Sequence, residues 1–379
     1  MGKKRFDPNS AAEPDSGIFG LPYEESESKL VYLPVPWEAT TSYGEGTADG
    51  PAAILAASAQ LDLFDLEVEK PYEAGFFMLP ENSEVRAWNE EARGLARKII
   101  ASGGRIDGDA KLKSALARVN ALSEKLNGFV RAETRRLLAA GKIAGIVGGD
   151  HSCPLGAFEA AAESFGEYGI LHFDAHSDTR DAFEGFTCSH ASIMRNALDR
   201  IPKIKKLTQV GIRDFCEEEH AYVLAQKNRA SVFYDLDLQR RKFQGAPWAT
   251  ISKEIIDTLP RQVWISFDID ALDPRFCPHT GTPVPGGLDF SEAVFLIRQL
   301  ATSGRKILGF DLCEVAPDPD SRAAWHAAQT GATRHVAQTG DEWDANVGMR
   351  LLYKLSAWTL ASQAKKRLPT FGGVAHRKK

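Results

Sequence analysis

The amino-acid sequence predicts an α/β fold whose parallel sheet is covered by helices on both faces. Beyond residue 143, short apolar runs of strand length alternate with segments that have the three- and four-residue apolar spacing of amphipathic helices. Strands that alternate with helices are typical of parallel sheets buried on both faces. By length, 379 residues could form two or three domains of about 150 residues each. No low-complexity linker separates comparable halves, so we predict one enlarged domain.

The elements are expected in the following order. A short strand over 29–35 ends at prolines, and Pro51 opens a helical pattern over 51–64, since proline is tolerated in a first helical turn. Apolar residues at three- to four-residue spacing predict a long helix over 109–140. Further strands are expected at 143–147, 169–173, 206–212, 231–234, 263–269 and 307–310. Helices are expected at 154–165, 190–199, 216–227, 250–258, 290–303 and 344–363.

Three stretches fall outside this alternation. Residues 1–28 are rich in Pro, Gly, Ser and acids and are predicted to be an extended N-terminal arm. Residues 70–108 are mixed in character and are taken as an insertion in a single domain that spans 29–364. The lysine-rich residues 365–379 are expected to be a basic, solvated tail.

Composition excludes several classes of protein. The chain is 43% hydrophobic with a net charge of −5, which argues against intrinsic disorder and against a nucleic-acid partner. No uncharged apolar run approaches the roughly 20 residues of a membrane span. The N-terminus lacks the apolar segment of a secretory signal. We therefore expect no membrane partner. Five scattered cysteines without paired spacing are typical of reduced thiols, so we also expect a cytoplasmic location.

Acids and histidines gather where three apolar runs end. The segments GGDHS (148–152), DAHSD (174–178) and SFDIDALDP (266–274) each follow a predicted strand. Because sites in parallel α/β sheets form at the carboxyl ends of strands, these segments should meet at one edge. Alternate residues of an extended segment point the same way, which would bring together acids and histidines. The predicted set is His151, Asp174, His176, Asp178, Asp268 and Asp270.

Such a set of side chains indicates a metal centre. Unpaired buried carboxylates would repel one another, whereas four carboxylates and two divalent cations balance in charge. Carboxylate and imidazole without thiolate suit Mn²⁺, Ni²⁺, Co²⁺, Fe²⁺ or Zn²⁺, and six ligands suit two ions that share carboxylates. Isolated acids and histidines nearby are better explained as caps, turns or packing residues. This second group is Asp150, Asp273, His172 and His279.

Taken together with TGTPVPGGL (280–288) and WEATTSYGEGTADGPAAI (37–54), these motifs resemble the ureohydrolase family, which includes arginases and agmatinases. The resemblance runs from about residue 29 to 360 and keeps the expected order. It implies an arginase-like three-layer α/β/α sandwich with a mostly parallel central sheet, assembled as a homo-oligomer, a trimer or hexamer. The extra length is similar to a long agmatinase-like branch that includes nickel-dependent guanidine hydrolases.

The resemblance also implies roles for residues. His190, in CSHAS, matches a proton-shuttle histidine, and Glu314, in GFDLCEVAP, matches the glutamate that holds the guanidinium group. Asp174 and Asp268 would bridge two metal ions, Mn or Ni. One ion would be held by His151, Asp174, Asp178 and Asp268, and the other by Asp174, His176, Asp268 and Asp270.

The function implied is that of a binuclear-metal hydrolase. It would attack the guanidinium carbon of free guanidine, agmatine or a short substituted guanidine and release urea plus ammonia or an amine. The tract TRDAFEGFTC, after Asp178, lacks the Asn- and Ser-bearing pattern by which arginases hold an α-amino acid, which disfavours arginine. Candidate pocket-wall residues, for which core packing or exposure is an equal alternative, are Trp37, Tyr43, Trp325 and His326.

Three alternatives stay open at this point. The related deacetylase fold binds one zinc and should lack a counterpart of His151. A formiminoglutamase would need a basic residue for a glutamate-like tail, and Arg180 could serve. A non-catalytic subunit that supports an active paralogue would release no urea by itself.

Overall fold

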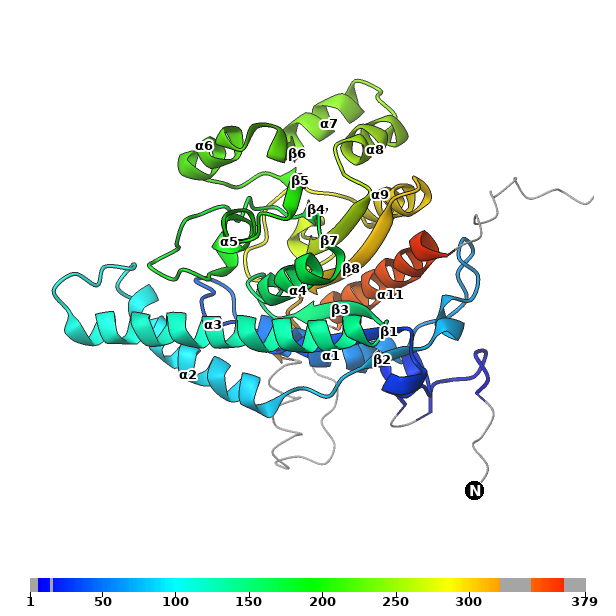
Figure 1. Ribbon diagram of the computed structural model, residues 1–379, viewed down its shortest axis with the longest axis horizontal. Helices are drawn as coiled ribbons and strands as arrows, with labels where there is room; N and C mark the ends of the chain where they lie inside the picture. Colours follow the sequence, from blue (N-terminus) through cyan, green and yellow to red (C-terminus); the bar gives the residue numbers. More distant parts are fainter. Residues whose placement is uncertain (1–5, 14–15, 321–341, 365–379) are drawn as a thin grey trace, which may run out of the picture.

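The computed structural model describes residues 6–13, 16–320 and 342–364, and a parallel sheet forms its centre. The strands are β1 (Leu30–Val35), β2 (Phe76–Met78), β3 (Ile143–Gly148), β4 (Tyr168–Phe173), β5 (Ile204–Ile212), β6 (Ala230–Tyr234), β7 (Gln262–Asp268) and β8 (Lys306–Cys313). These eight strands lie in the order β2-β1-β3-β8-β7-β4-β5-β6, and every neighbouring pair is parallel. Figure 1 shows them from β6 at the top to β2 at the bottom.

Helices cover both faces of this sheet (Figure 1). One layer contains α1 (Gly50–Ser58), α8 (Trp248–Asp257), α9 (Phe290–Thr302) and α11 (Trp343–Gln363). The other contains α2 (Ser83–Ile100), α3 (Ala110–Ala139), α4 (Leu155–Phe165) and α5 (Ile193–Arg200). Two further helices, α6 (Glu217–Ala225) and α7 (Asp235–Phe243), lie beside β6. The architecture is the expected three-layer α/β/α sandwich with a parallel central sheet.

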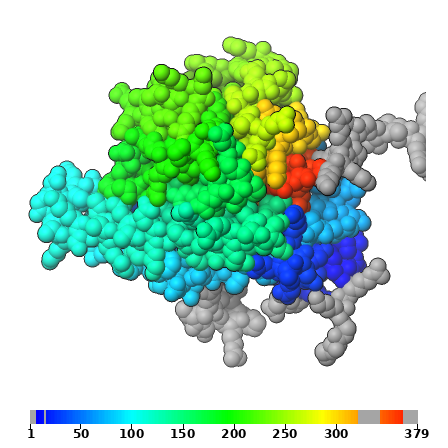
Figure 2. Space-filling view, viewed as in Figure 1, coloured from blue at the N-terminus to red at the C-terminus, as the bar shows by residue number. Residues whose placement is uncertain are grey.

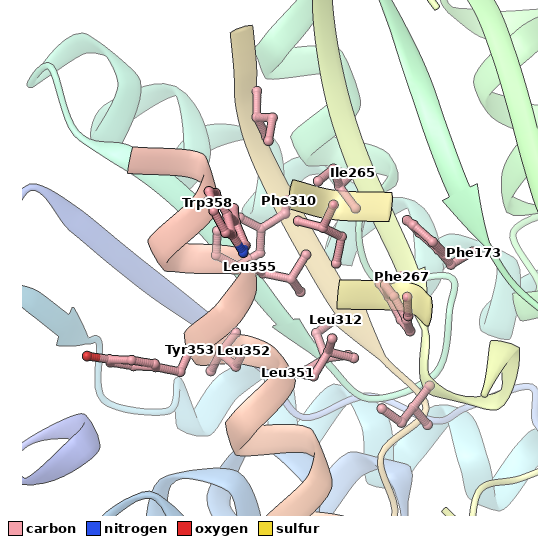
Figure 3. Packing of buried hydrophobic residues seen from close by; sticks show 14 of the residues in the cluster. Phe173, Ile265, Phe267, Phe310, Leu312, Leu351, Leu352, Tyr353, Leu355 and Trp358 are labelled. Carbon is pink, nitrogen blue, oxygen red and sulfur yellow. The ribbon is translucent and has the colours of Figure 1, made fainter. Parts of the chain in front are cut away.

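The core between the sheet and the α11 layer is continuous. Phe173 and Phe267, from neighbouring strands, stack with ring centroids 4.6 Å apart. Figure 3 shows Phe310 and the strand residues beside it facing Leu355 and Trp358 of α11. Because these side chains are fully buried, each contributes about 1.5–3 kcal/mol of hydrophobic free energy. This packing holds the central strands, and hence the residues at their ends, in fixed positions.

Most predicted strands and helices are present within a few residues. The helical pattern that begins at Pro51 ends at Ser58 rather than at residue 64. Helix α7 was not predicted, because its sequence DLDLQRRKF is largely polar and buries little more than Leu238. Residues 70–108, which had no assignment, contain the edge strand β2 and the helix α2, which is capped by Asn82.

The N-terminal segment differs from an extended arm. Ile18, Phe19 and Leu21 are buried in the core, and the Phe19 ring packs edge-on against Tyr353 at 5.1 Å. Burial of these apolar side chains outweighs the turn-forming tendency of the Gly-, Pro- and Ser-rich sequence around them. The predicted tail at 365–379 lies outside the described residues. Across the described ranges, no helix combines the length and apolar character needed to span a membrane.

One part of the molecule projects from the body. Helices α2 and α3 pack against each other, and Figure 2 shows the cyan segment that joins them at one end of the molecule. The insertion at 70–108 therefore adds the edge strand β2 and one helix, α2, which packs against α3. The domain boundaries themselves stay predictions.

Candidate active site

The sheet order explains how motifs far apart in sequence come together. Four adjacent central strands, β3, β8, β7 and β4, run parallel, so their carboxyl ends lie at the same edge. The last residue of β7, Asp268, and the segments that follow β3, β4, β7 and β8 carry all the predicted metal ligands and Glu314. The predicted ligands are called the acidic centre below and are His151, Asp174, His176, Asp178, Asp268 and Asp270.

The side chains of the acidic centre converge. The Nδ1 atom of His151 lies 3.0 Å from Asp174 Oδ2, 3.3 Å from Asp178 Oδ2 and 3.2 Å from Asp268 Oδ2. The Nδ1 atom of His176 lies 3.0 Å from Asp270 Oδ2 and 3.5 Å from Asp174 Oδ1. Asp174 thus contacts both imidazoles, which is the arrangement needed for a bridging carboxylate.

The convergence does not arise from extended segments, as the spacing had suggested. β4 ends at Phe173, before the DAHSD motif, and Asp270 lies in a 3-10 turn, Ile269–Ala271. Asp178 has a positive φ of 54°, a conformation that costs a non-glycine residue about 1–3 kcal/mol. The Asp268 carboxylate accepts the Asp270 N–H at 2.9 Å and so folds the turn. Tight turns, rather than strand alternation, aim these side chains at one point.

The carboxyl groups of the acidic centre repel one another. Burial and the charge of Asp174 raise the pKa of Asp178 to about 8. Burial, Asp270 and Asp174 raise the pKa of Asp268 well above its usual value. Burial opposes the charged form of His176, but Asp270 and Asp174 outweigh it and raise its pKa to about 12. Without cations, Asp178 and Asp268 therefore tend to keep their protons, and bound cations would favour their ionised forms.

A second layer of residues orients His151. Its Nε2 lies 2.9 Å from Ser266 Oγ, and Ser266 Oγ donates to Asp311 Oδ1 at 2.7 Å. Trp264 Nε1 donates to the other oxygen of Asp311 at 2.7 Å. Since the Ser266 proton goes to Asp311, Ser266 can only accept from His151. Nε2 therefore carries a proton and Nδ1 faces the centre. Burial opposes the charged form of His151, but hydrogen bonds to Asp174, Asp178 and Asp268 outweigh it and raise its pKa well above the usual value, so a bound metal ion would replace the proton on Nδ1.

A similar chain orients Asp174. His172 Nε2 lies 2.8 Å from Asp174 Oδ2, and His172 Nδ1 lies 3.0 Å from Gln209 Nε2. Gln209 Nε2 also donates to the Ser177 carbonyl at 2.7 Å, which fixes the amide orientation. Gln209 is thus the donor to His172 Nδ1, and His172 donates from Nε2 to Asp174. His172 is a buried, satisfied residue, as predicted, but it also holds a predicted ligand.

Sequence reasoning had missed the supporting roles of His172, Ser266 and Asp311. One signal was present for two of them. His172 and Ser266 each precede a predicted ligand by two positions, so each shares its strand face. Asp311 carried no such signal, because its function depends on β8 lying beside β7.

Glu314 directly follows β8 and is held rigidly. Its φ is +63°, and its N–H donates to the Gly149 carbonyl at 2.8 Å. Its own carbonyl accepts the Thr280 hydroxyl at 2.8 Å. Oε1 accepts the backbone N–H of His151 at 2.9 Å, so the carboxyl group lies directly beside the acidic centre. Burial and the charge of Asp150 raise the pKa of Glu314 well above its usual value. A cationic partner would restore its charged form.

His190 lies at the start of a 3-10 turn, His190–Ser192, that leads into α5. Its Nδ1 lies 3.4 Å from Thr40 Oγ1 and 3.3 Å from Ser189 Oγ. Burial and the charge of His176 lower the pKa of His190 to about 3, so its imidazole is neutral at pH 7. A neutral imidazole can accept a proton and pass it on.

The isolated acids and histidines that the sequence explains as caps, turns or packing residues have partners of that kind. Asp150 Oδ1 accepts the Ser152 N–H at 2.9 Å, and Asp273 Oδ1 accepts the Arg275 N–H at 3.0 Å, as turn caps do. His279 is bound to Asp344, at the start of α11. Cys153, Cys188 and Cys313 are buried free thiols, consistent with packing.

The candidate pocket-wall residues differ in their exposure to solvent. Trp37 is fully buried in the core, so packing explains it. Tyr43 is 83% exposed in the loop that follows β1. Trp325 and His326 lie outside the described residues.

The donor set fits divalent metal ions. Imidazole Nδ1 atoms and carboxylate oxygens converge without a thiolate, which suits Mn²⁺, Ni²⁺ and similar ions. Among the described residues, groups of donor atoms that could hold an ion include His151 with His172, Asp174 and Asp178, and Asp174 with His176 and Asp270. The raised pKa values of Asp178 and Asp268 give a separate indication that cations belong here.

Solved structures share this fold. The agmatine ureohydrolase of Thermoplasma volcanium has a TM-score of 0.63 at 22% identity, and the match covers 89% of this chain and 92% of that chain. The proclavaminate amidino hydrolase of Streptomyces clavuligerus has a TM-score of 0.66 at 21% identity, covering 93% and 100%. At these identities the likeness establishes the arrangement of the fold.

Sequence comparison establishes the family. The model of the Arginase family matches residues 28–337. An N(1)-aminopropylagmatine ureohydrolase of Thermus thermophilus is 32% identical over 317 residues, which cover 82% of this chain and 91% of that relative. An agmatinase of Klebsiella pneumoniae is 33% identical over 304 residues, covering 79% and 83%. The chain is a hydrolase of amidine C–N bonds, and it belongs to the arginase family, the ureohydrolases.

Proposed function

We propose that the acidic centre of this ureohydrolase holds two divalent metal ions, Mn²⁺ or Ni²⁺. Asp174 and Asp268 would be shared between the ions, with His151 and Asp178 completing one site and His176 and Asp270 the other. The convergence of both imidazole Nδ1 atoms on carboxylate oxygens supports this assignment. When bound, two such ions lower the pKa of a shared water towards about 7 and so supply a nucleophile at neutral pH.

We propose that Glu314 binds the guanidinium group of the substrate. A carboxylate offers two acceptor oxygens to the planar set of N–H donors, and charge-assisted bonds of this kind are strong and directional. The contact between Glu314 Oε1 and the His151 N–H carries the proposal, because it fixes that carboxylate beside the acidic centre. A guanidinium bound there would have its carbon held over the centre, and a fixed geometry favours attack.

His190 would then complete the reaction. The guanidinium carbon gains an oxygen, the C–N bond breaks, and the leaving nitrogen must take a proton. The attacking water gives up a proton, and His190 would relay it to that nitrogen. The products are urea and an amine, or urea and ammonia if the substrate is guanidine itself.

We propose agmatine or a related guanidino amine as the substrate, with free guanidine as the second candidate. The similar curated proteins are named for agmatine or aminopropylagmatine. The segment after Asp178 lacks the pattern with which arginases bind the α-amino acid end of arginine. Both observations favour a substrate without an α-carboxylate.

The alternatives receive less support. Arg180, the residue that a formiminoglutamase could use, lies 3.6 Å from Glu219 and stacks on Phe183 at 4.9 Å. It already has an anionic partner. The match to the Arginase family over residues 28–337 argues against the single-zinc deacetylase alternative.

The deciding experiment measures urea release from a panel of compounds by purified protein loaded with Mn²⁺ or with Ni²⁺. The panel contains guanidine, agmatine, aminopropylagmatine, arginine, guanidinoacetate, guanidinobutyrate and formiminoglutamate, the last assayed by formamide release. We expect the highest kcat/KM for a guanidino amine or guanidine and the lowest for arginine. Protein with two bound ions that turns over none of them would be a non-catalytic subunit, and the proposal would be wrong.

Assembly as a trimer or hexamer and a cytoplasmic location follow from the resemblance and the composition, and both stay predictions. Light scattering of the purified protein would determine the oligomeric state.

A further inference from the structure

The loop that follows β1 lies between the two proposed catalytic side chains. We call residues 38–46 the rim loop. Near its start, Thr40 Oγ1 lies 3.4 Å from His190 Nδ1. Near its end, the Gly44 N–H donates to the Gly281 carbonyl at 3.0 Å. A Cβ placed on Gly281 would lie 3.4 Å from Glu314 Oε2, so this contact borders the proposed guanidinium site.

The rim loop is tied to helix α2, which belongs to the insertion. Asn89, Arg93 and Arg97 are spaced by four residues and therefore share one face of that helix. Asn89 Oδ1 accepts the N–H of Glu38 at 2.8 Å. Arg93 and Arg97 donate to the two carboxylate oxygens of Glu45, at 2.9 and 2.7 Å. One helix face thus holds both ends of the loop.

Arg93 makes the most extensive of these contacts. Its Nη1 donates to the carbonyls of Ala39 and Thr41, and its Nη2 donates to Glu45. Only 7% of the residue is exposed. The two carbonyls flank Thr40, the residue that contacts His190. A planar guanidinium with several fixed donors can hold such a geometry, whereas a lysine ammonium acts as a single point.

The loop is also closed on itself. Glu38 Oε2 accepts the N–H of Gly46 at 2.6 Å. The residues between these two ends therefore form a closed loop, and its position relative to the sheet is set by α2. Without the contacts to α2, the rim loop would no longer hold Thr40, which contacts His190, at a fixed distance from Gly44, which contacts Gly281 beside Glu314.

We propose that α2, through Asn89, Arg93 and Arg97, is a positioning element that fixes the rim loop and thereby sets the affinity for the guanidino substrate. The proposal rests on the proposed function and deepens it by assigning substrate selection to the insertion. Arg93 is its central positioning residue. A pocket wall that would contact the substrate equally before and during the reaction contributes uniform binding, so release of the rim loop should change KM more than kcat.

The test replaces Arg93 and measures both kinetics and loop mobility. Arg93→Ala should raise KM for agmatine about tenfold with kcat within about twofold, since small displacements of a binding wall weaken positioning. Hydrogen–deuterium exchange of peptides covering 38–46 should become faster, while the protein still binds two Mn²⁺. Arg93→Lys keeps the positive charge but loses the planar set of guanidinium donors, so it should give a KM between those of wild type and Arg93→Ala. Lys98→Ala, an exposed change on the same helix, is the matched control.

A second variant guards against misfolding, because Arg93 is buried. Glu45→Gln removes the anion bound by Arg93 and Arg97 without changing the helix, and it should also speed exchange of the rim loop. Unchanged KM and unchanged loop exchange in Arg93→Ala and Glu45→Gln would overturn the proposal. If wild-type protein released no urea, the proposed function would fail, while loop exchange would still decide whether α2 holds the rim loop.

Discussion

The acidic centre and the rim loop both contain carboxylates close to other charged groups, but those of the centre are buried and Glu45 of the rim loop is exposed, and the two regions neutralise them differently. In the acidic centre, the pKa of Asp178 rises to about 8 because burial and Asp174 disfavour its charge. In the rim loop, burial also opposes the charge of Glu45, but Arg97 and Arg93 outweigh it and lower its pKa. Glu45 of the rim loop thus has cationic partners within the chain, whereas the raised pKa values of Asp178 and Asp268 fit the proposal that cations are supplied to the centre from outside.

This contrast separates the chemistry from the selection of substrate. Changes in the centre should remove metal and turnover together. Changes in the rim should leave the metal in place and alter binding. Four predictions test this division and are given in order of decreasing expected effect. The variant Arg93→Ala, described above, tests the role of helix α2.

The largest effect is expected from removing a predicted metal ligand. His176→Ala, or Asp268→Ala, should lose at least one ion and lower kcat/KM by about a thousandfold or more, since a bound cation supplies several kcal/mol of transition-state stabilisation. Metal analysis of the purified protein and urea release measure the two effects. His220→Ala is the control, because His220 bonds to Tyr234 at the edge strand β6. Full turnover with two ions in His176→Ala would show that the ligands are misassigned.

Glu314→Gln keeps the shape of the side chain but removes its charge. We expect two bound ions and a loss of about a hundredfold in kcat/KM for agmatine, because a hydrogen-bonded charge pair is worth about 2–5 kcal/mol when one partner is lost. The surface change Glu254→Gln serves as the control, since Glu254 pairs with Arg241. Kinetics equal to those of wild type would remove Glu314 from the site.

Ser266→Ala tests the residues behind the centre. The change removes the partner of His151 Nε2 and should weaken metal binding by about 10–100-fold, as loss of such outer contacts does. Titration calorimetry of metal-free protein with Mn²⁺ measures the effect. The buried serine of α8, Ser252, gives a matched Ser→Ala control. An affinity equal to that of this control would mean that Ser266 does not orient His151.

The smallest effect concerns the pH dependence of the rim loop. The folded-state pKa of Glu45 is lowered, so its pairing contributes stability above its unfolded pKa of about 4.3, and that contribution is lost as pH falls through the folded value. At pH 7, peptides covering 38–46 should exchange a few-fold more slowly in wild type than in Glu45→Gln. The ratio should begin to fall below the unfolded pKa of about 4.3 and should approach one only when the pH lies below the lowered folded-state pKa. A constant ratio across this range would show that charge pairing at Glu45 does not hold the loop.

Much of the acidic centre could be predicted from sequence because its donors lie within short motifs. DAHSD and DID bring most of the ligands together within a few residues of a strand end. The reason given for their convergence was nevertheless wrong in part, since Asp178 has a left-handed backbone conformation and Asp270 lies in a 3-10 turn. Helix α7 and the buried segment around Phe19 were missed because tertiary packing overrides weak local propensity.

The sequence by itself determined the fold class, the residue types of the centre and the family, because each is expressed in local periodicity or in short motifs. Tertiary structure decided the order β3-β8-β7-β4, which makes those motifs meet, and the support of His151 by Ser266 and Asp311. It also decided the attachment of the rim loop to α2, where Arg93 and Glu45 are 48 residues apart. A hydrogen bond between charged side chains so distant in sequence leaves no periodic pattern, so only the folded chain reveals it.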